Sequence, residues 1–255
     1  SREILEQMEY VRALPLFADR VLDFLDCVSK RLMQSKEAKK YPDVIAYAFW
    51  IRREYLERAG RRYRSEAQRI GRGTAFQIAP SNIPVQFAVS MTYALTAGNA
   101  SIIRVSDKEF QQVGIICQIV HGILSHEHPE MAPYICVVRY RHSDEMTQAL
   151  TDICDIRMIW GGDHTIAAIR KCAVPARCLD IGFADRYSIA VIDSGEYLEK
   201  DAAVLARDFY NDTYFADQNA CSSPRLVIWT GSSIPEAKEI FWSELENLVS
   251  EKYRM

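Results

Sequence analysis

Short β-rich runs alternate with amphipathic segments through the middle of the chain, and this alternation limits the possible folds most strongly. Strands are predicted over residues 74–79, 100–105, 134–140, 156–161 and 187–193. Helices are predicted to begin between them, near Val85, Lys108, Ser143 and His164. Strands that alternate with helices are typical of a parallel sheet with crossover helices. The sequence therefore predicts an α/β fold with a doubly wound, Rossmann-type parallel sheet.

The regions on either side of this alternation have different patterns. Between Leu14 and Arg64 the apolar residues recur at helical spacing, and Pro42 divides this stretch into at least two helices. Beyond the sheet, a helix is predicted over 199–211, followed by a polar loop, a strand over 224–229 and a helix from Pro235. We therefore expect a helical segment over 1–65, a dinucleotide-binding domain over 66–193 and the beginning of a second domain over 194–255.

Composition and charge favour an ordinary soluble protein with a small-molecule ligand. The 255 residues are 49% hydrophobic and 25% charged, with a formal charge of -3. This charge gives no electrostatic reason to bind nucleic acid or an anionic membrane. No apolar run reaches the roughly 20 residues that span a bilayer, and the N-terminus lacks a secretory pattern. We therefore expect a cytoplasmic protein that binds neither nucleic acid nor membrane.

Seven cysteines form an odd set without a CxxC pair or a histidine at metal-ligand spacing, so we expect reduced thiols and no metal site. Most of them lie in apolar runs, where a free cysteine behaves as a small hydrophobic residue. Cys221 differs because it lies in the polar loop DQNACSSPR, residues 217–225. Backbone amides or a positive dipole would make its thiolate a nucleophile. The alternative is an incidental loop cysteine.

In open α/β sheets ligands bind at the carboxyl ends of the strands, so the residues that follow the strands are informative. The segment IAPSNIPV, residues 78–85, holds Ser81 and Asn82 between two prolines before a helix. The Asn82 amide would donate a hydrogen bond to an oxyanion. The alternative is a helix cap or an Asx turn.

Two further segments follow predicted strands. In AGNASIIRVSDK, residues 97–108, Arg104 and Ser106 suit a phosphate, whereas the Asp107 carboxylate suits ribose hydroxyls. In IWGGDHTI, residues 159–166, Gly161 and Gly162 would let backbone amides approach a pyrophosphate at a helix start. This is not the GxGxxG fingerprint, and the alternative is an ordinary turn between a strand and a helix.

Taken together, APSNIPV, AGNASIIRVS and DQNACSSP resemble the LuxC-type acyl-CoA reductase branch of the aldehyde dehydrogenase superfamily. The resemblance runs from about Phe49 to the end of the chain. It implies that Cys221, after Gln218, is the nucleophile and that Asn82 assists the oxyanion hole. It also implies that the second domain is the catalytic domain, here incomplete.

The resemblance implies a nicotinamide cofactor. The implied cofactor-binding residues are Ser81, Arg104, Ser106, Asp107, Gly161 and Gly162. The Arg104 guanidinium would form a charge-assisted hydrogen bond with a 2′-phosphate, so we expect NADPH to bind more tightly than NADH. An inward-facing Asp107 would instead favour NAD. Ordinary aldehyde dehydrogenases have a glycine four or five residues after the glycine turn, where this chain has Thr165 and Ile166.

The family's general-base glutamate falls on LDIG, which makes Asp180 the candidate, with a shorter side chain. A thioester reductase does not need to activate water, so it does not require a strong base. The resemblance thus implies reduction of a fatty acyl thioester, on coenzyme A or on a protein, to an aldehyde through an acyl-cysteine. An acyl-protein synthetase or acyl carrier is an implied partner, and we expect a homo-oligomer.

Other interpretations remain open. Family members continue well past the nucleophile, and this chain opens with Ser1 rather than Met, so we expect a truncated enzyme. A catalytically silent nucleotide-binding or scaffold subunit of a fatty-acid reductase assembly is the main alternative. An acyl-transferring hydrolase would need a GxSxG elbow and a histidine after Ser223, and the sequence has neither. The basic stretch in residues 52–64 is better explained as a solvated helix face than as a nucleic-acid site.

Overall fold

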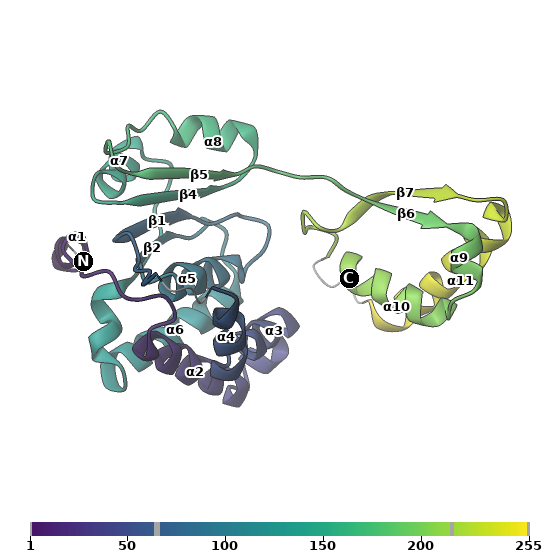
Figure 1. The fold of residues 1–255 in the computed structure, drawn as a ribbon, viewed down its shortest axis with the longest axis horizontal. Helices are drawn as coiled ribbons and strands as arrows, with labels where there is room; N and C mark the ends of the chain where they lie inside the picture. Colours follow the sequence, from purple (N-terminus) through teal and green to yellow (C-terminus); the bar gives the residue numbers. More distant parts are fainter. Residues whose placement is uncertain (1, 64–66, 215–216, 254–255) are drawn as a thin grey trace. The chain divides into compact units, whose positions relative to one another are not determined.

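The computed structural model describes residues 2–63, 67–214 and 217–253, and Figure 1 shows their path. The chain forms two compact units, one over residues 1–184 and one over residues 185–255. The first unit contains the helical N-terminal segment together with the main sheet. The predicted domain boundaries near residues 65 and 193 stay predictions.

A five-stranded parallel sheet forms the centre of the first unit. Its strands are β1 (Thr74–Ile78), β2 (Ala100–Arg104), β3 (Ile135–Val138), β4 (Ile156–Trp160) and β5 (Leu179–Phe183). Their order is β3-β2-β1-β4-β5, and every neighbouring pair is parallel. The order reverses between β1 and β4, which is the switch point of a doubly wound sheet. The predicted fold class is therefore confirmed.

Four helices connect these strands, and each begins within three residues of the predicted position. They are α5 (Gln86–Thr96), α6 (Gln111–His126), α7 (Asp144–Asp152) and α8 (Asp163–Ile169). α7 is capped by Ser143, whose side chain accepts a hydrogen bond from the Met146 amide. In Figure 1 α5 and α6 lie beside β1 and β2, whereas α7 and α8 lie beside β4 and β5.

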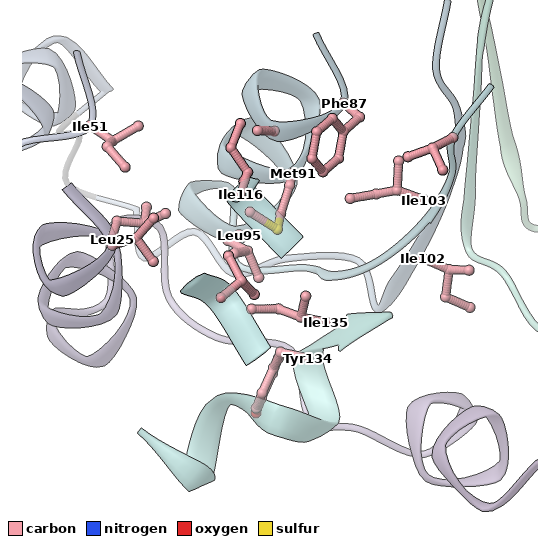
Figure 2. Packing of buried hydrophobic residues seen from close by; sticks show 14 of the residues in the cluster. Leu25, Ile51, Phe87, Met91, Leu95, Ile102, Ile103, Ile116, Tyr134 and Ile135 are labelled. Atoms are coloured by element: carbon pink, nitrogen blue, oxygen red, sulfur yellow. The ribbon is translucent and has the colours of Figure 1, made fainter. Parts of the chain in front are cut away.

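The helices predicted between Leu14 and Arg64 are present as α2 (Asp19–Gln34), α3 (Pro42–Trp50) and α4 (Arg53–Gly60), and they pack into the same core as the sheet. A further helix, α1 (Arg2–Glu9), precedes the stretch for which helices were predicted. Short 3-10 turns lie at Ala38–Lys40 and Arg61–Tyr63, and another, Pro129–Tyr134, precedes β3. Pro42 occupies the first turn of α3, where its missing N–H is not needed. Figure 2 shows Ile103 of β2 pointing toward Phe87 and Met91 of α5, among fully buried side chains.

One polar network lies inside this apolar core. Gln77, in the middle of β1, is fully buried. Its Nε2 donates to Ser101 Oγ on β2 at 2.6 Å, and its Oε1 accepts a hydrogen bond from Ser90 Oγ on α5. Because both ends of the amide are satisfied, the network avoids the desolvation cost of a buried polar group. It therefore fixes α5 against two neighbouring strands.

The second unit is built on a two-stranded parallel sheet of β6 (Ser188–Asp193) and β7 (Pro224–Thr230). The prediction that residues 187–193 belong to the main sheet is wrong, because this run pairs with β7. The helices are α9 (Ser194–Leu198), α10 (Ala202–Thr213) and α11 (Ile234–Lys252). Their core centres on Tyr197 and Phe241, with Trp229 of β7 edge-on to both rings.

Candidate functional site

The segment after β1 lies at the carboxyl edge of the main sheet. The Ala79 amide donates to the Arg104 carbonyl at 3.0 Å, which holds the start of this segment beside the end of β2. Ser81 and Asn82 are exposed, as a ligand-binding role requires. The N-cap of α5 is Val85 rather than Asn82, so the helix-cap alternative does not account for Asn82.

A small hollow separates the segment after β1 from the segment after β2. It is lined by apolar residues that include Ala79, Pro80 and Phe87, and by the polar residues Ser106 and Lys108. Ser106 Oγ also accepts a hydrogen bond from the Lys108 amide at 3.2 Å, which closes a tight turn. Asp107 is exposed at the tip of this turn. With a volume of about 10 Å³ the hollow has room for about one water molecule, so it is not a ligand pocket by itself.

Arg104 is the last residue of β2 and is held by Tyr140, two residues beyond the end of the neighbouring strand β3. Its guanidinium carbon lies 4.8 Å from the centre of the Tyr140 ring, and its Nη2 donates to the Tyr140 carbonyl at 3.2 Å. Its Nε is buried and has no hydrogen-bond partner among the described residues. A buried guanidinium N–H without a partner is energetically costly, so an acceptor from a ligand would stabilise this arrangement.

The turn after β4 is less well adapted to a pyrophosphate than its two glycines suggest. The Gly161 amide already donates to the Phe183 carbonyl at 3.2 Å. A Cβ at Gly161 would lie 3.0 Å from the Thr165 side chain, so close packing alone explains this glycine. Gly162 is the N-cap of α8, whose first turn carries Asp163. That carboxylate opposes a phosphate at the helix start.

Asp180 lies away from the carboxyl edge because it is the second residue of β5. Its Oδ2 accepts from Arg157 Nη2 at 2.7 Å and from Arg170 Nε at 3.3 Å. Arg157 is 1% exposed and also donates to the carbonyls of Ile169 and Cys172. The contacts of Asp180 therefore favour neutralisation of a buried guanidinium over general-base catalysis, and the predicted catalytic role stays a prediction.

Cys221 is exposed in the loop that joins α10 to β7, three residues before the strand. Ser188 Oγ donates to the Cys221 carbonyl at 2.8 Å, and the buried Ser223 donates to the Asp212 carbonyl at 3.0 Å. Asp217 and Gln218 have φ angles of 52° and 57°, a left-handed conformation that non-glycine residues seldom adopt. Strained backbone around an exposed thiol is often found at functional sites.

The structure brings Ser81, Asn82, Arg104 and Ser106 to one edge of the main sheet, together with Gly161 and Gly162 at the end of β4. Cys221 belongs to the second unit, and Asp180 lies on the edge strand β5, near its amino end. Three aromatic residues at this edge were missed by the sequence reasoning. Tyr140 contacts Arg104, whereas Trp160 and Phe183 stack at 4.0 Å beside the glycine turn. Only their positions at strand ends could have indicated them.

Cys221 is expected to react first with a maleimide at neutral pH, because the other thiols are buried or half-buried. Burial raises the pKa of the Cys117 thiol to about 11 and also raises the pKa of Cys172, so their thiolate fractions are small. Mass mapping after brief labelling would measure the order. Modification of Cys172 or Cys178 ahead of Cys221 would contradict the assignment of the nucleophile.

No helix within residues 2–63, 67–214 and 217–253 is long and apolar enough to cross a membrane. The same ranges contain no group of three or more His, Cys, Asp or Glu side chains that could hold a metal ion.

The arrangement of helices and strands is that of an aldehyde dehydrogenase. A lactaldehyde dehydrogenase superposes with a TM-score of 0.69 at 16% identity, over 98% of this chain and 56% of that one. An NAD-dependent benzaldehyde dehydrogenase from Corynebacterium glutamicum superposes with a TM-score of 0.67 at 15% identity, over 96% of this chain and 57% of that one. At these identities the likeness establishes the fold alone.

Sequence comparison defines the family. The chain matches the family described as Acyl-CoA reductase (LuxC) over residues 6–252. The protein therefore belongs to the LuxC family, as the resemblance predicted. It is 26% identical to a long-chain acyl-protein thioester reductase of Aliivibrio fischeri over 179 residues, which are 69% of this chain and 35% of that protein. It is 25% identical to long-chain acyl-protein thioester reductase 2 of Photobacterium leiognathi, over 72% of this chain and 36% of that protein. The chain thus spans about a third of the length of these relatives.

Proposed function

We propose that this chain provides the cofactor-binding edge and the nucleophile of a reductase that converts a fatty acyl thioester to an aldehyde with NADPH. The observation that carries the proposal is the exposed Cys221 in a constrained loop before β7, within a chain that matches the LuxC family. The names of the relatives from Aliivibrio and Photobacterium support a long-chain acyl-protein as substrate. An acyl carrier or acyl-protein synthetase partner, a homo-oligomer and a cytoplasmic location belong to the same proposal.

Cys221 acts first as the nucleophile. Its thiolate attacks the thioester carbonyl, and the carbonyl oxygen becomes an oxyanion. The family resemblance assigns the hydrogen-bond donor for this oxyanion to the Asn82 amide. The carbon–sulfur bond to the carrier then breaks, which releases the carrier thiolate and leaves an acyl group on Cys221. This exchange of one thioester for another needs no base to activate water. The ion-paired Asp180 therefore has no required step in the reaction.

The residues at the carboxyl edge fit the adenosine end of a nicotinamide dinucleotide. The unpartnered Arg104 Nε and the hydroxyl of Ser106 provide donors for a 2′-phosphate beside an apolar hollow. The bound cofactor supplies the hydride that reduces the acyl group. Cys221 then leaves as the thiolate when the resulting thiohemiacetal collapses to the aldehyde. Ser81 and the glycine turn at Gly161 and Gly162 belong to the same proposed cofactor site. Asp107 is exposed at the tip of its turn, and NAD would be favoured if its carboxylate faced the ribose hydroxyls.

Intact-mass measurement tests this function directly. The chain is incubated with tetradecanoyl-CoA, and we expect an added acyl group that peptide mapping locates on Cys221. Addition of NADPH is then expected to remove the acyl group and release tetradecanal. NADPH binding without acylation would contradict the proposal. It would support the alternative of a catalytically silent nucleotide-binding or scaffold subunit of a fatty-acid reductase assembly.

Asn82→Ala is expected to lower the rate of acylation by about 100-fold or more, the usual effect of losing one oxyanion donor. Stability should change little because Asn82 is exposed. Single-turnover acylation followed by mass measures the rate, and Asn211→Ala, at another exposed asparagine, is the matched control. An acylation rate equal to that of the wild type would reduce Asn82 to a turn residue.

A further inference from the structure

We propose that Tyr140 is a positioning residue that holds the Arg104 guanidinium toward the 2′-phosphate of the cofactor and thereby sets the preference for NADPH over NADH. This inference rests on the proposed function. It goes beyond it because Tyr140 follows β3, whereas the residues that would touch the cofactor lie at the ends of other strands.

The described contacts of Tyr140 with Arg104 are made to the guanidinium group of Arg104. Tyr140 lies two residues beyond the end of β3, the strand next to β2 in the sheet. Its ring centre is 4.8 Å from the guanidinium carbon of Arg104, within the range of a cation–π contact. Its carbonyl accepts a hydrogen bond from Arg104 Nη2 at 3.2 Å. The contact with the ring restricts the orientation of the guanidinium plane, and the hydrogen bond to the carbonyl fixes the position of Nη2.

Tyr140 is itself fixed by α7. Its phenol oxygen lies 3.1 Å from Thr147 Oγ1, and Thr147 is buried and donates to the Ser143 carbonyl at 2.8 Å. Burial also raises the pKa of the Tyr140 phenol, so the side chain stays neutral beside the arginine. The ring is therefore a rigid support anchored in the first turn of a helix.

This support leaves donors on Arg104 for a ligand. A guanidinium has five N–H groups in a fixed fork, and the described contacts use one of them. A long side chain without a support would lose much rotamer freedom on binding a phosphate. Because Tyr140 already orients the guanidinium, less rotamer freedom is lost on binding. The resulting gain in affinity applies to NADPH, which has the 2′-phosphate, and not to NADH.

The test compares Tyr140→Leu, Tyr140→Phe and Arg104→Ala with the wild-type chain. Dissociation constants for NADPH and NADH are measured by cofactor fluorescence, and adenosine 2′,5′-bisphosphate serves as a competitor that contains the phosphate but no nicotinamide. The matched control is Tyr55→Leu, because Arg58 lies over the Tyr55 ring at a similar distance, 5.2 Å, on α4.

We expect Tyr140→Leu to weaken NADPH and the bisphosphate by about fivefold to tenfold, the range of a partly buried cation–π contact, with NADH changed less than about twofold. Tyr140→Phe should keep most of the NADPH preference, because the ring and the backbone carbonyl remain and only the anchoring hydrogen bond to Thr147 is lost. Tyr55→Leu should change none of the three constants. Arg104→Ala should remove the preference for NADPH entirely.

Three outcomes would overturn the inference. If Arg104→Ala removes the preference but Tyr140→Leu keeps it, the positioning role is wrong while the proposed NADPH site stands. If Tyr140→Leu weakens NADPH and NADH equally and lowers the unfolding midpoint, Tyr140 is merely structural. If Arg104→Ala leaves the preference intact, both the positioning role and the reading of the phosphate by Arg104 are wrong.

Discussion

Cys221→Ser is expected to reduce acyl-enzyme formation by about 10⁴-fold or more, because a serine hydroxyl is a much weaker nucleophile than a thiolate at neutral pH. The fold should be unaffected, since Cys221 is exposed and its only described hydrogen bond uses the backbone carbonyl. A change in unfolding free energy within about 0.5 kcal/mol is expected for such a surface substitution. Single-turnover acylation with tetradecanoyl-CoA measures the effect.

Cys178→Ser is the matched control for this variant. Cys178 is half-buried in the first unit, and its sulfur lies 3.7 Å from that of Cys154, so it has a neighbour but no proposed role in acyl transfer. We expect it to acylate at the wild-type rate. If the Cys221→Ser variant were acylated at the wild-type rate, the nucleophile would be a different residue. Peptide mapping of that product would identify the residue.

Asp180→Ala is expected to lower the free energy of unfolding by about 3 to 5 kcal/mol, the usual cost of removing one partner from a buried ion pair. The reason is Arg157, whose side chain is 1% exposed and whose Nη2 would lose its carboxylate. Arg170 also contacts Asp180, but it is half-exposed and can turn to water. Denaturant unfolding followed by fluorescence measures the change. Asp19→Ala, which removes an 86%-exposed partner of Arg53, should cost less than about 1 kcal/mol.

A double variant separates the structural role of Asp180 from a catalytic one. Arg157→Leu combined with Asp180→Ala removes both charges, and well-packed apolar replacements of buried ion pairs are often close to neutral. We therefore expect it to recover much of the stability lost in Asp180→Ala. If Asp180→Ala were as stable as the wild type but defective in acyl release, Asp180 would act as a base and the structural account would be wrong.

The order of strands and helices was predictable because apolar periodicity is a local property of the sequence. The missed strand, β5, is at an edge of the sheet, and its residues include the exposed Leu179, the ion-paired Asp180 and Gly182. It therefore lacks the continuous apolar run of a central strand. The misassigned strand β6 has a normal strand pattern. Pairing with β7 rather than with the main sheet depends on contacts between distant segments, which periodicity does not encode.

The candidate site was predictable only as a set of strand ends. Arg104, Ser106 and Asn82 were found because residues that follow parallel strands share one edge. The partner of Arg104 is 36 residues away in sequence, so nothing local indicated Tyr140. In the same way, nothing local in the sequence indicated that the Asp180 carboxylate contacts the buried Arg157. Side-chain pairing across strands decides such roles, and a single sequence does not reveal it.

The polar network in the core, formed by Gln77, Ser90 and Ser101, has an evolutionary consequence. Replacing any one of the three residues by an apolar residue leaves a buried donor or acceptor of another without its partner. Single steps toward an all-apolar core are therefore selected against, although the final triple replacement need not be. We expect homologues to retain the trio or to replace it as a set. Homologues that keep the trio would therefore also keep the orientation of α5 and of the segment before it, which carries Asn82.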